Sequence, residues 1–329
     1  PVEAAEAMPT ADIDRIVRYF QYTFIDGKFY TIFSLLFGIG FSIIIANAME
    51  RGTNGFHIFY RRMAILLLVG FLHLMFLWSG DILMLYALLG MLLPLFRNVS
   101  NRMLLVSAFV LLAIPIAVDF IVEFSGIYPS ASVVELQQSY CAQYGITDEN
   151  FAYWLRDAKH YNETFKFLVQ GALVRVQEFV DGNRYFKVLG LFLLGFYIGR
   201  NRLYTHLESH RSALRQIACY GFGFGLPLSL FYAWSAMNNC PRSLGVHSVL
   251  YFISVFPLSF AYIAGICLCF LRHPQWGIFR FFAMPGRMAL TNYIGQSLFG
   301  MLLFYGIGWG FGAETGLIYV IMIAVSVWV

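Results

Sequence analysis

A histidine in the middle of an apolar segment is the first residue of this chain that could do chemistry. His73 lies within the segment 61–78, and Asp81 follows eight residues later. Ionisable side chains are costly inside a bilayer and usually mark functional sites there. A neutral imidazole in an apolar tunnel suits a general base or a relay for a transferred group. The alternative is a structural histidine that donates to a neighbouring backbone carbonyl.

Asp81 has two interpretations. Ser79-Gly80 is expected to break the helix of His73 and to start a second apolar helix over 81–96. Asp81 would cap that helix, and the same carboxylate could orient an acceptor hydroxyl at the outer mouth of the bundle. Trp78 and Ser79 belong to this turn, so we include them in a candidate polar network.

Arg61 and Arg62 begin the helix that carries His73. Eleven residues at 1.5 Å each place His73 about 16 Å from Arg62, half of a hydrocarbon core of about 30 Å. With Arg287, this pair is a candidate site for the phosphates of a nucleotide, which guanidinium groups bind in bidentate fashion. The alternative is that these arginines only anchor helix ends at the lipid surface.

Asn292 and Gln296 lie four residues apart on one face of the helix that follows Arg287. Amides at this spacing commonly form hydrogen bonds between membrane helices. They become site residues if their face turns toward His73. We expect no metal site, because paired metal-ligand histidines are absent from the sequence, as are a P-loop and a dinucleotide fingerprint.

Composition identifies the elements that must position these residues. The chain is 59% hydrophobic and 12% charged, whereas soluble domains are about 25% charged, so we infer an integral membrane protein. Its 22 basic residues against 18 acidic ones do not indicate nucleic-acid binding, because the arginines lie in short loops. Nine apolar segments are candidate spans: 29–49, 61–78, 81–96, 103–124, 185–199, 213–236, 247–271, 288–309 and 314–329.

When the loops between these spans are assigned alternately to the two sides of the membrane, most of the arginines lie on one side. Positive charge marks the cytoplasmic side, so we expect a multi-pass protein of a bacterial inner membrane with 125–184 outside. The fold class expected is all-α, a polytopic transmembrane bundle of about nine spans. We divide it into an outer interfacial segment 1–28, a first helix group 29–124, the outer segment 125–184 and a second helix group 185–329.

Helical spacing of apolar residues between Phe151 and Val176 predicts one or two amphipathic helices in the outer segment, which would form an extracytoplasmic cap. A further helix is expected over 8–27. Because the chain starts at Pro1 and stops within an apolar run, we also expect it to be a fragment that lacks one or more helices.

Small residues and cysteines add packing predictions. Ser34, Gly38, Ser42 and Ala46 form a stripe at spacing four, and Gly195 and Gly199 repeat the spacing, which predicts close helix packing. The glycines at 221, 223 and 225 could unwind a span. Cys141 and Cys240 fall in outer loops on an oxidising side, so they are a candidate disulfide.

Several segments together indicate a family: Phe33 to Phe41, Arg61-Arg62, His73 with Leu77 to Leu83, Leu194 to Arg200, Gly286 to Tyr293 and Gln296-Ser297. These segments resemble the YeiB-like family of bacterial membrane proteins, which is named for its unknown function. The family is similar in turn to the transmembrane acyltransferases, which include type 3 acyltransferases and the lysosomal heparan glucosaminide acetyltransferase.

That resemblance implies transfer of an acyl group from cytoplasmic acyl-CoA to an acceptor on the far side of the membrane. Type 3 members carry an arginine and, after ten intervening residues, a histidine, a spacing that Arg62 and His73 match. They also carry a histidine on a first span, and this chain has no span before residue 29.

The leading hypothesis is therefore an inner-membrane acyltransferase with acyl-CoA as co-substrate, catalytic His73 and Asp81, and Arg61, Arg62 and Arg287 at the phosphates. Two alternatives stay open: a transporter or lipid-handling protein, and a structural membrane subunit without catalysis. The partners expected are membrane lipid and an extracytoplasmic small-molecule or glycan acceptor, with a homo-oligomer left open and no nucleic acid.

Overall fold

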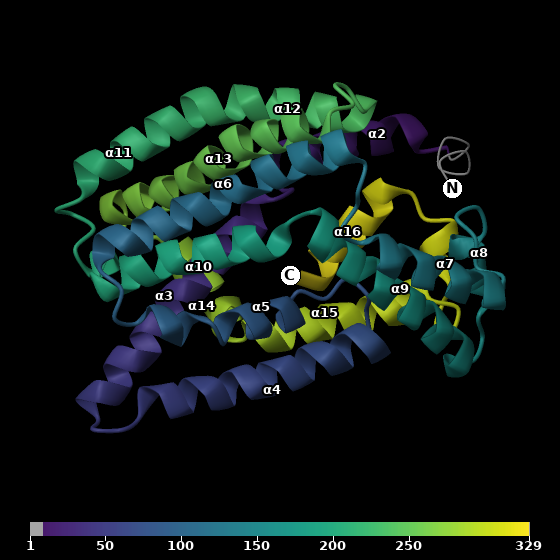
Figure 1. Ribbon diagram of the computed structural model, residues 1–329, viewed down its shortest axis with the longest axis horizontal. Helices are drawn as coiled ribbons and strands as arrows, with labels where there is room; N and C mark the ends of the chain where they lie inside the picture. Colours follow the sequence, from purple (N-terminus) through teal and green to yellow (C-terminus); the bar gives the residue numbers. More distant parts are fainter. Residues whose placement is uncertain (1–8, 329) are drawn as a thin grey trace.

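The computed structural model describes residues 9–328, which form helices joined by turns, with no β-strand in that range (Figure 1). The fold is an all-α polytopic bundle, as predicted. The α-helices are α2 (Ala11–Phe24), α3 (Lys28–Glu50), α4 (Gly55–Phe76), α5 (Leu83–Gly90), α6 (Asn101–Ser125), α7 (Ala131–Tyr144), α8 (Phe151–Asp157), α9 (Tyr161–Asp181), α10 (Arg184–Arg200), α11 (Arg211–Tyr220), α12 (Leu226–Asn238), α13 (Leu244–Arg272), α14 (Gly277–Arg287), α15 (Ala289–Phe304) and α16 (Leu317–Trp328). Short helical turns are η1 (Leu93–Phe96), η2 (Leu203–Thr205), η3 (Gly221–Gly225) and η4 (Phe311–Ala313).

Within residues 9–328, five helical stretches are long and apolar enough to cross a membrane: Ala11–Glu50, Gly55–Phe76, Asn101–Ser125, Arg211–Asn238 and Leu244–Arg272. They correspond to five of the nine predicted spans. The other four predicted spans correspond to shorter helices, namely α5 with η1, α10, α15 and α16. In Figure 1, α6 and α11 to α13 form one layer, α4 and α15 form another, and α3 and α10 run between them.

Helices α3 and α10 pack closely through their glycines, as the small-residue spacing predicted. A Cβ atom on Gly38 would overlap the carbonyl oxygen of Phe192, and one on Gly195 would overlap the carbonyl oxygen of Leu35. Side chains larger than hydrogen would push the two backbones apart.

An aromatic core fixes α4 and α5 to this helix pair. The ring of Phe41 in α3 lies 4.6 Å from that of Phe59 in α4 and 5.0 Å from that of Phe196 in α10, measured between centroids. Tyr86 of α5 is buried and shares a hydrogen bond of 2.6 Å with Ser34 of α3. The N-terminal part of α4 is therefore held against α3 through Phe59.

The segment 125–184 contains α8 and α9 where the spacing between Phe151 and Val176 predicted one or two helices, and also α7, which the sequence did not predict. They cover one end of the bundle (Figure 1). Leu168 of α9 is fully buried and packs with Met301, Tyr305 and Trp78. The helix expected over 8–27 is present as α2.

The glycine run does not unwind its span. Gly221 to Gly225 form a π-helical turn that joins α11 to α12 without a break. Gly221 packs against the carbonyl of Pro257 and the side chain of Ala261 in α13, and Gly225 packs against Leu258, so these two glycines permit close packing with α13. A helix that the sequence did not predict, α14, precedes α15.

Candidate functional site

His73 lies at the point where α4 ends. The backbone N–H groups of Leu77 and Trp78 both donate to its carbonyl oxygen, at 3.0 and 2.8 Å, and the chain then turns toward α5. One turn earlier, a Cβ on Gly70 would meet the backbone nitrogen of Met84. This glycine lets the first turn of α5 approach α4 directly beside the imidazole.

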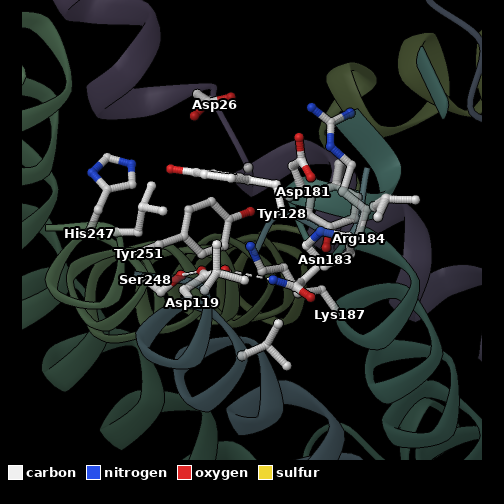
Figure 2. A pocket seen from close by; sticks show the side chains of 18 of the residues that line it. Asp26, Asp119, Tyr128, Asp181, Asn183, Arg184, Lys187, His247, Ser248 and Tyr251 are labelled. Atoms are coloured by element: carbon white, nitrogen blue, oxygen red, sulfur yellow. Dashed lines mark hydrogen bonds between the residues drawn. The ribbon is translucent and has the colours of Figure 1, made fainter. Parts of the chain in front are cut away.

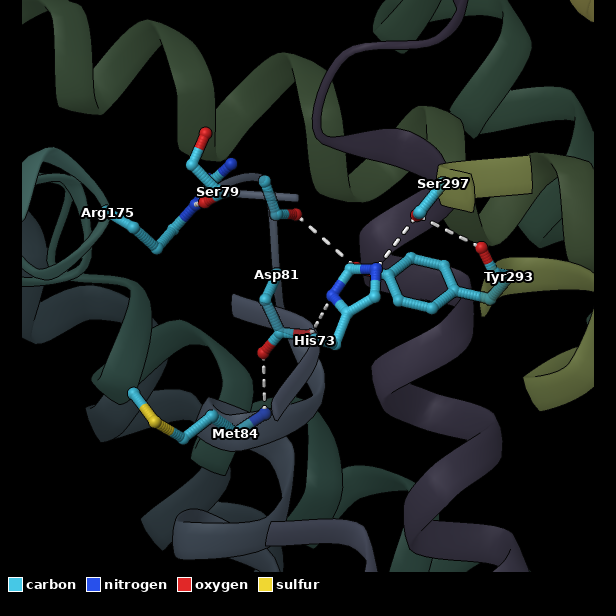
Figure 3. A network of polar contacts seen from close by, with 8 residues as sticks. His73, Ser79, Asp81, Met84, Arg175, Tyr293 and Ser297 are labelled. Carbon is cyan, nitrogen blue, oxygen red and sulfur yellow. Dashed lines mark hydrogen bonds and ion pairs between the residues drawn. The ribbon is translucent and has the colours of Figure 1, made fainter. Parts of the chain in front are cut away.

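Asp81 holds the imidazole from that turn (Figure 3). Its Oδ1 lies 3.0 Å from Nδ1 of His73, and its Oδ2 accepts a hydrogen bond of 2.8 Å from the backbone N–H of Met84. Both side chains are 1% exposed. The carboxylate therefore binds the first turn of α5 and the histidine at the same time, so the capping and functional interpretations of Asp81 are compatible.

Ser297 of α15 is the third side chain of this network, and it contacts His73. Its Oγ lies 2.8 Å from Nε2 of His73 and 3.1 Å from the carbonyl oxygen of Tyr293. The ring of Tyr293 lies against the imidazole, with 4.9 Å between centroids, and its hydroxyl donates to the carbonyl of Gly80 at 3.4 Å. Helix α15 thus contacts the end of α4 through these two side chains (Figure 3).

Two proton arrangements fit these distances. When Asp81 is ionised and His73 neutral, Nδ1–H donates to the carboxylate, and Nε2 accepts from the Ser297 hydroxyl. When His73 is protonated, both ring nitrogens donate, and Ser297 turns its hydrogen to the carbonyl of Tyr293. A hydroxyl, an imidazole and a carboxylate in this order make up the geometry of an activated nucleophile, its base and the group that orients the base.

The turn that the sequence singled out lies under α9. Trp78 stacks on Tyr305 with 5.6 Å between ring centroids, and the carbonyl of Ser79 accepts a hydrogen bond of 3.0 Å from Nε of Arg175. Arg175 also pairs with Glu178 at 2.6 Å. Burial lowers the pKa of the Arg175 guanidinium from its usual value, although arginine stays charged at physiological pH.

The predicted phosphate-binding arginines lie away from this network. Arg61, Arg62 and Arg287 are exposed, and none has a hydrogen bond or ion pair within residues 9–328. The structure brings His73, Asp81 and the 78–79 turn together, but it leaves the arginines on other parts of α4 and α14. Their guanidinium groups are free to bind an external anion.

The amide pair of α15 also faces away from His73. Nδ2 of Asn292 donates to the carbonyl of Pro285 at 3.1 Å, which closes the end of α14, and Gln296 is exposed. Ser297, one position further, is the residue that reaches the imidazole. Sequence reasoning missed Ser297, Tyr293 and Arg175; the i, i+4 pair of Tyr293 and Ser297 was the available signal.

The structure does not contain the predicted disulfide: Cys141 and Cys240 are free thiols in it. Cys141 is buried in α7 and accepts a hydrogen bond of 3.2 Å from Nε2 of Gln137, whereas Cys240 is exposed in the loop after α12. Burial raises the pKa of the Cys141 thiol. Residues 9–328 contain no group of three or more His, Cys, Asp or Glu side chains placed to hold a metal ion.

Comparisons with known proteins find relatives without an assigned activity. A family model described as "Protein of unknown function (DUF418)" matches residues 198–329. The uncharacterized protein YxaH of Bacillus subtilis is 27% identical over 296 residues, which cover 87% of this chain and 69% of that protein. The uncharacterized protein YeiB of Escherichia coli is 25% identical over 306 residues, which cover 85% of this chain and 70% of that protein.

A shorter match is closer in sequence. An uncharacterized 39.9 kDa protein of Bacillus acidopullulyticus is 39% identical over 100 residues, which cover 30% of this chain and 29% of that protein. No solved structure matches the chain.

Proposed function

Because the chain belongs to the YeiB-like family, whose function is unknown, its chemistry has to be inferred from its own side chains, and we propose that it is a membrane acyltransferase. The observation that carries this proposal is His73, which lies 3.0 Å from Asp81 and 2.8 Å from Ser297 in a buried site. Acyl transfer needs a nucleophile, a base and a group that fixes the tautomer of the base, and these three side chains match those roles.

The chemistry proceeds in two balanced steps. Nε2 of His73 removes the proton of Ser297, whose Oγ bonds to the acyl carbon of a thioester. The carbon–sulfur bond breaks, and the thiolate leaves with the proton from His73. In the second step His73 takes a proton from an acceptor hydroxyl or amine, the acceptor attacks the acyl-serine, and Ser297 recovers its proton. Asp81 stabilises the imidazolium in both steps.

The proposed donor is acyl-CoA from the arginine-rich side. Arg61, Arg62 and Arg287 are exposed and unpaired in the described chain, which suits them to phosphate groups. The proposed acceptor is a sugar or other envelope component that enters on the opposite side, beneath α7 to α9. In this proposed layout the protein lies in a bacterial inner membrane with its arginine-rich loops on the cytoplasmic side, in agreement with the positive-inside rule.

Transfer of a radiolabelled acetyl group tests the proposal. The purified chain in lipid nanodiscs is incubated with labelled acetyl-CoA, and label on the protein is located by peptide mapping. We expect an acetyl ester on Ser297 and a loss of labelling of about 100-fold or more in His73→Ala. Ser297→Ala should lose the label, while Gln296→Ala, the exposed neighbour on the same helix, should keep it.

The alternatives give different results. A transporter would move solute across proteoliposomes in a His73-dependent manner without any thioester. A structural subunit would lose stability in His73→Ala and would show no labelling in any variant. Absence of both acetyl-CoA binding and serine acylation in folded protein would overturn the acyltransferase proposal.

A further inference from the structure

A second polar site lies next to the α4 to α5 turn, with a lining that does not include His73. A cavity of about 370 Å³ is enclosed by α6, α10, α13 and the turn between α2 and α3 (Figure 2). Ile82 contributes to its wall, so it adjoins the α4 to α5 turn without including His73. Its volume is within the range of about 300–1,000 Å³ found for small-molecule sites.

Two carboxylates in the cavity wall already accept hydrogen bonds from the protein. Asp119 accepts hydrogen bonds from Asn183, at 2.7 Å, and from Ser248. Asp26 accepts from the hydroxyl of Tyr232 at 3.1 Å. These groups shape the cavity, and their bonds leave them with little need for a ligand.

Three other groups in the lining have unmet hydrogen-bonding capacity. Nζ of Lys187 lies 4.3 Å from the ring centroid of Tyr251 and has no hydrogen bond or ion pair in the described chain. Asp181 accepts from Ser130 through Oδ2, but its buried Oδ1 has no partner, and neither does the buried hydroxyl of Tyr30. Buried polar atoms without partners are uncommon in folded proteins because each carries a desolvation cost.

From these unpaired groups we infer that the cavity binds a small zwitterion, a molecule that joins an ammonium to a carboxylate or phosphate. The anionic part would pair with Lys187, and the ammonium would donate to Oδ1 of Asp181. Charge-assisted hydrogen bonds of this kind are stronger than neutral ones. A ligand with a single charge would pair with Lys187 or with Asp181, and the other group would keep its unmet hydrogen-bonding capacity.

This chemistry has two sources in a membrane protein: free amino acids, and the head group of phosphatidylethanolamine. The site is independent of the acyl-transfer proposal, because it shares no hydrogen-bonding side chain with His73, Asp81 and Ser297. Both sources present N–H donors to Asp181. Phosphatidylcholine has the same charges but no N–H group, so it is a matched control.

Binding is measured by calorimetry on the full chain in detergent, with L-alanine, L-serine and phosphoethanolamine as probes. Propionate and ethylamine serve as the two halves of a zwitterion. We expect at least one zwitterion to bind ten-fold or more tightly than either half. The lipid arm compares the melting temperature in nanodiscs of phosphatidylethanolamine and phosphatidylcholine, and a rise in the former alone identifies the head group as the source.

Variants test whether the calorimetric binding or the lipid-dependent rise in melting temperature arises from the cavity. Lys187→Met and Asp181→Asn should weaken binding ten-fold or more, or abolish the lipid-dependent rise. Lys159→Met removes an exposed lysine of the α8 to α9 loop and should change nothing. Tyr30→Phe keeps the ring and removes only the unpaired hydroxyl. If the charged-site variants fail to fold, this variant is used instead, and it should weaken the binding of the zwitterion. The inference is overturned if no probe binds and the two lipids are equivalent, or if Lys187→Met behaves like Lys159→Met.

Discussion

Replacement of Asp81 by asparagine separates the roles that this carboxylate combines. In Asp81→Asn, the amide oxygen has to accept from the N–H of Met84, because that donor is fixed in the backbone at 2.8 Å. The amide nitrogen then faces Nδ1 of His73 and donates to it. His73 is forced into the tautomer with its hydrogen on Nε2, which can no longer accept the proton of Ser297.

The magnitudes follow from the two hydrogen bonds. Bonds to a charged group contribute about 1.5–3 kcal/mol and neutral ones about 0.5–1.5 kcal/mol, so Asp81→Asn should cost about 2 kcal/mol of unfolding free energy. Asp81→Ala removes both acceptors and leaves a buried N–H unpaired, so it should cost about 3–5 kcal/mol. Any base activity of His73 should fall about 10⁴-fold in Asp81→Asn, as expected for a wrong tautomer.

Two measurements check this reasoning. Nitrogen chemical shifts of labelled histidine report the tautomer, and His73→Asn identifies the His73 signals by their loss. Denaturant unfolding in detergent gives the stability of each variant, with the exposed Asp157→Asn as a control that should change little. An Nδ1–H tautomer that persists in Asp81→Asn, or equal stability of the Asn and Ala variants, would refute the geometry.

Three further predictions concern helix packing and the burial of thiols in the chain. Gly38→Ala should destabilise the chain by about 1–3 kcal/mol, because its methyl group overlaps the backbone of α10, whereas Gly40→Ala has open space and should be neutral in the same unfolding assay. At neutral pH a maleimide should label the exposed Cys240 quickly and the buried Cys141, with its raised thiol pKa, only after unfolding; rapid labelling of Cys141 would contradict its burial. Arg175→Lys should increase hydrogen exchange in α9, because the single Nζ of lysine does not reproduce the two bonds that Nε and Nη1 of the guanidinium make to the Ser79 carbonyl and to Glu178; unchanged exchange would show that packing alone holds this helix.

Helices with continuous apolar surfaces were predictable from the sequence. The predicted segments 29–49, 103–124 and 247–271 correspond to Lys28–Glu50, Asn101–Ser125 and Leu244–Arg272. Hydropathy reports such helices because lipid contacts require apolar side chains around them. Helices α7 and α14 were missed, because short helices at a surface are set by tertiary contacts as much as by local pattern.

The site was predictable only where its residues are close in sequence. His73 and Asp81 are eight residues apart, and a turn after one helical end brings them together. Ser297 lies 224 residues from His73 along the chain. Its i, i+4 spacing from Tyr293 marks a polar face on that helix, but a single sequence does not show which histidine this face meets. The disulfide prediction failed for the same reason. Cys141 and Cys240 are far apart in sequence, and their placement in loops predicted to lie on one side does not bring them into contact.

Ser297 is also the residue that best separates catalysis from structure. Asp81 binds two elements and His73 is almost fully buried, so removal of either changes stability along with any chemistry. The Ser297 hydroxyl has an alternative acceptor in the carbonyl of Tyr293 and lies in a half-buried side chain. Ser297→Ala leaves Nε2 of His73 without its hydroxyl partner, so it should cost about 1–3 kcal/mol, less than Asp81→Ala, while it removes the proposed nucleophile completely. A folded Ser297→Ala protein that retains full acyl transfer would leave His73 as the direct base for the acceptor, whereas loss of transfer in folded protein would assign the covalent step to this hydroxyl.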